Sequence, residues 1–155
     1  MKLDALLNLL ALLRALQFSH LTSHWQVRGL PFFGDHRMFE RLYHAVGDEI
    51  DTLAEKIVGD FGPEAVEPVA QAAKMAAVLA DCAHTTPVER ALMLEDKLQA
   101  KLRHLYHELK EAGDMSLGLD DYLMATANAH ESALYLLRQR LRALSSAMVQ
   151  GPVEG

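Results

Sequence analysis

Hydrophobic residues recur at helical spacing along four long stretches of this chain, and this pattern constrains the fold more than any other feature. The stretches lie at roughly 3–28, 35–60, 87–112 and 117–146. Breaks containing glycine or proline separate them, and an alanine-rich stretch at 69–80 predicts a short extra helix. β-branched and aromatic residues, which favour strands, are sparse. The chain is therefore predicted to be all-α.

The connections between the predicted helices narrow the architecture further. Two tight hairpins flank one long connection, which contains the short helix, and ferritin-like four-helix bundles are wired in this way. We therefore predict a ferritin-like four-helix bundle with a short extra helix in the long connection between helices two and three. No repeat or linker divides the chain, so 1–155 is predicted to be one domain with a flexible tail at 146–155.

Local signals mark several helix ends. Asp35 is predicted to cap the second long helix. Thr86 is predicted to cap the third, because Pro87 follows at the first helical position and Glu89 completes a capping box. Gly113 is predicted to end that helix.

The first predicted helix carries two apolar stripes where a bundle helix normally needs one. One stripe is Leu3, Leu6, Leu7, Leu10 and Leu13, and the other is Ala5, Leu9, Leu12 and Leu16. We interpret the second stripe as a surface covered by another copy of the chain. The alternative is a single broad apolar face inside a monomer.

Composition and charge argue against several classes of protein. The lone Cys82 cannot form an intrachain disulfide, so a disulfide-stapled secreted scaffold is not indicated. The formal net charge of −6 disfavours sequence-independent binding to DNA, because contacts to phosphates need clustered lysine and arginine. Asp4, Asn8 and Arg14 interrupt the leucine-rich start, so neither a signal peptide nor a transmembrane helix is predicted. We expect a cytoplasmic location and no membrane partner.

Metal-ligating side chains are densest around the first predicted hairpin. His36 and Glu40 are four residues apart on a helix, as are Asp51 and Glu55, so each pair points to one side. Such pairs usually decorate a solvated face, but imidazole plus carboxylate suits a first-row metal such as iron. Measured along the axis from a turn near residue 32, His24 lies at about 12 Å and Glu55 at about 34 Å. They can share a metal only if a second copy, packed head-to-tail, supplies the carboxylates.

At these residues the chain resembles the Dps proteins, the mini-ferritins of starved bacterial cells. The run SHWQVRGLPFFGDHRMFERLYHAVGDEIDTLAEKIV carries the pattern HW-x-V-x-G, an aromatic residue, and a histidine twelve residues after the first. A carboxylate follows at plus sixteen, and D-x-x-x-E begins at plus twenty-seven. These positions hold His24, His36, Glu40, Asp51 and Glu55, with Trp25 beside the first. Weaker likeness extends to GD with LDDYL at 113–123 and HESALYLLRQRL at 130–141.

The resemblance implies a function as well as a fold. Mini-ferritins assemble twelve subunits into a hollow shell and bind iron(II) at the interface across each two-fold axis. Hydrogen peroxide oxidises that iron by two electrons, and ferric oxide is stored inside, which limits oxidative damage. The chain is thus expected to be a ferroxidase that forms a homododecamer, acts on iron(II) and hydrogen peroxide, and holds iron at two positions per site.

The same resemblance assigns roles to individual residues. His24 and His36 are expected to be iron ligands from one subunit. Asp51 and Glu55 are expected to be ligands from the partner, with Glu55 bridging the irons or anchoring the tighter one.

Two further positions of the motif leave alternatives open. Glu40 stands where the family usually has aspartate, and its extra methylene is expected to shift or weaken the second iron position. Trp25 is either an electron donor beside the metal, and so part of the catalytic set, or a core aromatic.

The other histidines carry weaker signals. His20 stands one turn before His24, and such a pair can bind zinc; the alternative is a polar residue at an interface. No histidine has a glutamate three residues before it, which argues against a bacterioferritin-type di-iron centre inside one bundle. The rest are interpreted as surface or satisfied core histidines: His44, His84, His104, His107 and His130.

Acids near the start of the fourth long helix line the iron-entry pores of the family. Asp114, Asp120 and Asp121 are the pore residues predicted here. The alternative is that acids at a helix start simply favour the helix dipole.

DNA binding is predicted to be weak or absent. Many mini-ferritins hold DNA through a basic terminal tail, which we expect this chain to lack, and twelve copies would carry roughly −72 charges. The alternative function is a DNA-associated protective or structural shell with weak metal chemistry. A third alternative is a monomeric helical interaction module.

Overall fold

The computed structural model describes residues 2–149, and every regular element in that range is helical. The elements are α1 (Lys2–Gln26), α2 (Phe32–Phe61), the 3-10 turn η1 (Pro63–Ala65), α3 (Pro68–Ala80), α4 (Pro87–Ala112) and α5 (Leu117–Val149). The predicted all-α bundle with a short helix in its long connection is confirmed. Because α5 continues to Val149, the first four residues of the predicted tail are helical, and 150–155 lie outside the described residues.

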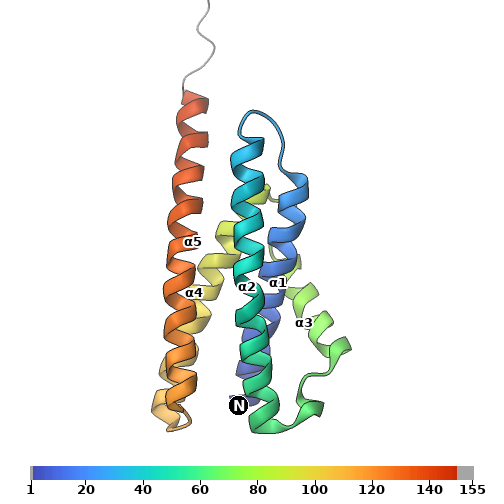
Figure 1. Cartoon of the computed structure of the whole chain (residues 1–155), viewed down its shortest axis with the longest axis vertical. Coiled ribbons are helices and arrows are strands. Elements are labelled where there is room, and N and C mark those ends of the chain that lie inside the picture. The colour runs from blue at the N-terminus through green and yellow to red at the C-terminus, as the bar shows by residue number, and fades with distance from the viewer. Residues whose placement is uncertain (1, 150–155) are drawn as a thin grey trace, which may run out of the picture.

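The long helices form two antiparallel hairpins that pack against each other (Figure 1). One hairpin is α1 with α2, and the other is α4 with α5. The short α3 lies against the flank of α1 on the connection that links the two hairpins (Figure 1). This wiring brings one face of each long helix to the centre of the molecule.

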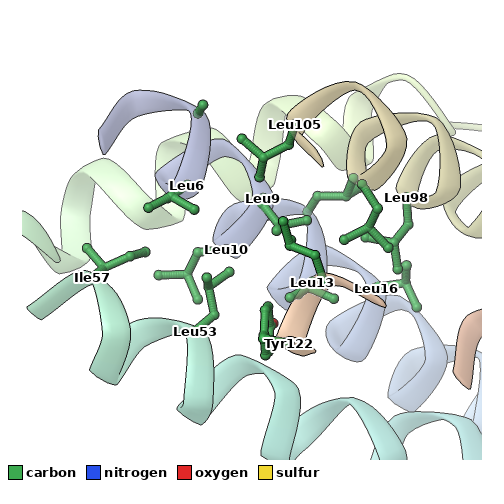
Figure 2. Packing of buried hydrophobic residues seen from close by; sticks show 14 of the residues in the cluster. Leu6, Leu9, Leu10, Leu13, Leu16, Leu53, Ile57, Leu98, Leu105 and Tyr122 are labelled. Carbon is green, nitrogen blue, oxygen red and sulfur yellow. The ribbon is translucent and has the colours of Figure 1, made fainter. Parts of the chain in front are cut away.

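The core is built around α1, which carries buried leucines on both predicted stripes, although Leu3 and Leu7 are only partly buried. Leu9, Leu13 and Leu16 are fully buried, and each contributes about 1.5–3 kcal/mol relative to exposure. Figure 2 shows these leucines between side chains of α2, α4 and α5. The interpretation that another copy covers the second stripe is wrong, because α2, α3 and α4 of the same chain surround α1.

The local signals for helix ends were right in two cases and wrong in one. Thr86 and Glu89 form the predicted capping box before α4, and Gly113 ends α4 in the left-handed conformation with φ 72°. Asp35 does not cap α2, which starts three residues earlier at Phe32. It is buried instead, and both of its oxygens accept hydrogen bonds from Arg140, at 2.6 and 3.1 Å.

Helix α1 is long and apolar enough, by length and composition alone, to cross a membrane. However, 61% of its most apolar window is buried inside the fold, as in the central helix of a water-soluble bundle.

Candidate metal centre

The α1–α2 hairpin brings His24 and His36 into direct contact. Gly29 in the connection has φ 82°, a conformation that glycine adopts without strain. The two imidazole rings stack with centroids 3.6 Å apart. Nδ1 of His24 lies 2.8 Å from the carbonyl oxygen of His36, and Nδ1 of His36 lies 2.8 Å from the carbonyl oxygen of His24. The pair is thus held by two reciprocal hydrogen bonds.

These hydrogen bonds fix which nitrogen of each ring carries the proton. A carbonyl oxygen only accepts, so Nδ1 must be the donor in both histidines. In the neutral imidazole Nε2 is then unprotonated and free to bind a metal. Metal-binding histidines commonly orient their rings through such a bond to a backbone carbonyl. The hairpin therefore presents two half-buried, pre-oriented nitrogen donors.

Two arginines anchor the helix ends that carry these histidines. Arg90 of α4 reaches across to the last two turns of α1. Its acceptors are Ser19 Oγ, Ser23 Oγ and Gln26 Oε1, at 2.7–2.9 Å. Arg140 of α5 holds Asp35, the residue before His36. The end of α1 and the start of α2, which flank the turn, are thereby both held by hydrogen bonds to the α4–α5 hairpin.

Glu40 lies one turn beyond His36, on the same side of α2. In this structure its carboxylate accepts a hydrogen bond from Arg37 at 2.7 Å. Arg37 is 65% exposed, and exposed pairs of this kind are worth about 0.2–1 kcal/mol. Glu40 can therefore leave Arg37 for a metal at small cost.

Asp51 and Glu55 lie far from the two histidines of their own chain. Both are exposed on α2, about 22 and 28 Å along the axis from His36. Within residues 2–149 neither makes a side-chain hydrogen bond or ion pair, and no three histidine, cysteine or acidic side chains there are placed to hold a metal ion. One chain presents both halves of the predicted site but cannot close it.

Trp25 points away from the core. It is 67% exposed beside His24, so the alternative of a core aromatic is wrong.

A buried network that the sequence analysis missed joins all four long helices. His130 of α5 lies between two carboxylates, with Nδ1 at 2.6 Å from Glu95 of α4 and Nε2 at 2.7 Å from Glu49 of α2. Glu95 also contacts Nε2 of His20 on α1, at 3.1 Å. His20 and Glu95 are completely buried. A cavity of about 240 Å³ between α2 and α5 reaches Glu49, Glu95 and His130.

The charges of this network stabilise one another. Burial would lower the pKa of His130, but hydrogen bonds to Glu49 and Glu95 outweigh it and raise the pKa to about 9. Burial would likewise raise the pKa of Glu95, yet its bonds to His130 and His20 hold that pKa below its usual value. His130 is therefore an imidazolium at neutral pH, with both ring nitrogens donating.

The remaining histidines fall as the sequence suggested, with one exception. His44, His84, His104 and His107 are exposed, and His130 is a satisfied core histidine. His20 is the exception, because its Nε2 bonds to Glu95 inside the bundle while His24 bonds to α2. Both interpretations of His20, as a zinc ligand with His24 and as a polar residue at an interface, are therefore wrong, because its side chain is completely buried within one bundle. His20 and Glu95 stand in line with buried leucines along their helices, a signal that marks them as core polar residues.

The three predicted pore acids are not equivalent. Asp114 and Asp121 are exposed near the start of α5. Asp120 accepts a hydrogen bond from Lys110 at 2.5 Å, so part of its charge is neutralised within the chain. The structure of one chain leaves their role in a pore as a prediction.

Two characterised proteins to which this sequence is similar carry the same description. No family model matches the chain. The DNA protection during starvation protein of Brevibacillus brevis is 32% identical over 98 residues, covering 63% of this chain and 62% of the relative. The protein of the same description from Helicobacter pylori is 27% identical over 95 residues, covering 59% and 65%. The chain thus matches just under two thirds of the length of these relatives.

Solved structures show the same fold over most of the chain. Dps from Thermosynechococcus elongatus superposes with a TM-score of 0.79 at 23% identity, covering 90% of this chain and 89% of that one. Dps from Vibrio cholerae, described as a member of a broad superfamily of ferritin-like diiron-carboxylate proteins, gives 0.76 at 23% identity, covering 90% and 88%. Sequence and fold together confirm the resemblance that the hairpin motif indicated.

Proposed function

Because this chain resembles the Dps family in sequence and in fold, we propose that it is the subunit of a cytoplasmic mini-ferritin. It oxidises iron(II), preferably with hydrogen peroxide, and stores iron(III) inside a dodecameric shell, which protects the cell from oxidative damage. The observation that carries the proposal is the His24–His36 pair, whose reciprocal bonds leave two Nε2 atoms free. Imidazole and carboxylate together are a donor set for iron.

The spacing of ligands along α2 supports a site shared between two copies. In an antiparallel, two-fold packing of α2 against the α2 of a second copy, residues pair symmetrically about one centre. A centre between positions 45 and 46 places His36 level with the partner's Glu55, and Glu40 level with the partner's Asp51. A single alignment of the two α2 helices therefore places both histidine–carboxylate and carboxylate–carboxylate pairs at the same level. By symmetry it builds two identical sites.

The surface around that centre has the features of an interface. Phe18 of α1 is 54% exposed beside it. A hollow of about 590 Å³ lies there, lined by residues of α1, α2 and α3 that include Phe18, Tyr43 and Met75. Gly47 of α2 also lines this hollow, and a Cβ atom there would lie 3.4 Å from the Gln17 side chain of α1. An exposed aromatic beside a hollow of mixed polar and apolar lining is suited to bury area against another copy.

The proposed reaction treats iron as the substrate. Two iron(II) ions give one electron each to one hydrogen peroxide, whose oxygen–oxygen bond breaks to give two hydroxide ions. The ferric ions then hydrolyse to ferric oxyhydroxide and release protons. Because peroxide takes both electrons at one site, less of it reacts with single iron ions to form hydroxyl radical. The chain's own residues bind the irons, with His24 and His36 on one side and the partner's Asp51 and the partner's Glu55 on the other.

Exposed Trp25 has a place in this scheme. It lies beside His24 at the surface where the second copy is proposed to pack. If peroxide arrives when a site holds one iron, the indole can give up the second electron. Glu40, freed from Arg37, completes the second iron position.

The proposal is tested by loading the protein with iron(II) without oxygen, adding peroxide once, and separating it by size. Twelve chains of 17.2 kDa form a particle of about 206 kDa. Iron eluting with that particle, at well over two ions per chain, supports storage. A shell that keeps no iron would favour the structural or DNA-associated alternative, and a small iron-free particle would overturn the proposal.

A further inference from the structure

A second group of metal-ligating side chains lies on the outer face of α4, away from the hairpin. His104, His107, Glu108 and Glu111 fall within eight consecutive residues. They line one surface hollow of about 540 Å³, together with Ala112. The residues that line this hollow all come from α4, so among the described residues the face is open to solvent.

Helical geometry places these four side chains together. At about 100° per residue, they occupy an arc of roughly 100° around the α4 axis. His104 has His107 three residues away and Glu108 four residues away, spacings at which Cβ atoms lie about 5–6 Å apart. His107 and Glu111 repeat the four-residue spacing. The opposite face of α4 packs into the core through leucines such as Leu105 and Leu109.

The contacts already present show that two of the donors reach each other. Nε2 of His104 lies 3.7 Å from a carboxylate oxygen of Glu108. Glu108 is only 31% exposed, which restricts its side chain, whereas His104 is 73% exposed and can reorient. Lys110, a cation near this face, is held by Asp120 and does not compete for the carboxylates.

We propose that this face of α4 binds a divalent transition-metal ion of the zinc type. His104, His107 and Glu108 are the ligands, water completes the tetrahedron, and Glu111 adds a second negative charge beside the ion. Imidazole nitrogen and carboxylate oxygen are the donors that zinc takes in such three-residue sites.

Binding needs side-chain rotation alone. In the part of the chain that the structure describes, no three donors converge on one point. The rotamers of exposed side chains interconvert within nanoseconds, and the helix backbone already holds the Cβ atoms at the required spacing.

The experiment measures zinc bound per chain by equilibrium dialysis at neutral pH. A variant with both His24→Ala and His36→Ala serves as the parent, so the proposed iron site contributes no imidazole donors. Into it are placed His104→Gln with His107→Gln, or Glu108→Gln alone. The matched control is Glu131→Gln, which removes an exposed carboxylate from α5.

The parent should bind one zinc ion per chain at this face. Loss of an outer-sphere partner already weakens metal binding about 10–100-fold, so each ligand variant should bind at least about tenfold more weakly. Glu131→Gln should bind as the parent does. Equal zinc binding in the parent and the His104/His107 variant would overturn the proposal, as would the absence of bound zinc in the parent. Neither result bears on the proposed iron site, whose two histidines the parent lacks.

Discussion

Two of the histidine clusters, one in the bundle centre and one at the α1–α2 hairpin, differ in which ring nitrogens their hydrogen bonds leave free. In the bundle centre, His130 gives both ring nitrogens to carboxylates and is an imidazolium at neutral pH. At the hairpin, His24 and His36 give only Nδ1 to carbonyl oxygens, so each keeps a free Nε2. The partner of Nδ1 is charged in one cluster and neutral in the other.

This difference separates a histidine that holds a fold together from one that can bind a metal. An imidazolium between two carboxylates has no lone pair to offer, and its charge neutralises groups that would be costly to bury alone. A neutral imidazole fixed by a carbonyl is oriented and still a ligand. The first cluster is therefore expected to govern stability, and the second to govern iron chemistry.

The largest expected effect is on stability, from removing the carboxylate shared by two buried histidines. Glu95→Ala leaves His130 with one partner and His20 with none, so the free energy of unfolding should fall by about 3–5 kcal/mol. Urea denaturation at fixed protein concentration measures it. The surface change Glu131→Ala should stay within about 0.5 kcal/mol. A similar small loss for Glu95→Ala would show that the network contributes little.

Alkaline pH should weaken the same network. The pKa of His130 is about 9 in the folded chain against an ordinary 6.5, so its stabilisation is complete below about 6.5 and disappears as the pH rises through about 9. Deprotonation of His130 should lower the free energy of unfolding by up to about 3 kcal/mol. Urea midpoints between about pH 7 and about pH 9.5 should fall for the native chain and stay flatter for His130→Gln. Parallel curves would contradict the charged state of His130.

Iron oxidation should depend on the open cluster instead. His24→Ala removes one free Nε2, and the rate of iron(II) oxidation by peroxide should drop about 100-fold, because even outer-sphere changes at metal sites cost 10–100-fold. The free energy of unfolding of this variant should differ from that of the native chain by less than about 1 kcal/mol. His84→Asn is the control, since it removes an exposed histidine elsewhere. A stability loss as large as that of Glu95→Ala would erase the distinction between the clusters.

The smallest expected effect is on iron binding at the second position of the hairpin site. Arg37→Gln removes the exposed partner of Glu40, whose ion pair is worth about 0.2–1 kcal/mol. Glu40 is then free, and iron at the second position should bind up to about fivefold more tightly in an anaerobic titration. Weaker binding would mean that Arg37 orients Glu40 for the metal.

The sequence predicted most of the fold because its signals are local. The capping box at Thr86 and the apolar periodicity of α4 set helix ends and faces without reference to the rest of the chain. The twelve-residue spacing across a short turn likewise predicted that His24 and His36 share one end of a hairpin, and the structure places them in contact.

Features that depend on other helices were missed or misread. Glu49 and Glu95 are far from His130 in sequence, and only packing makes them its partners. Asp35 looked like a cap because its partner, Arg140, is distant in the chain. The two stripes of α1 suggested a second copy because periodicity counts apolar faces but does not say which chain covers them.

The central claim is that two copies build each iron site, and mixing two inactive variants tests it most directly. One carries His24→Ala with His36→Ala, and the other carries Asp51→Ala with Glu55→Ala. Each alone should oxidise iron(II) at least about 100-fold more slowly than the native protein. Co-expressed in equal amounts, half of the two-fold pairs are hybrids with one intact site of two, so about a quarter of the native rate should return. A mixture no faster than its separate components would contradict a shared site.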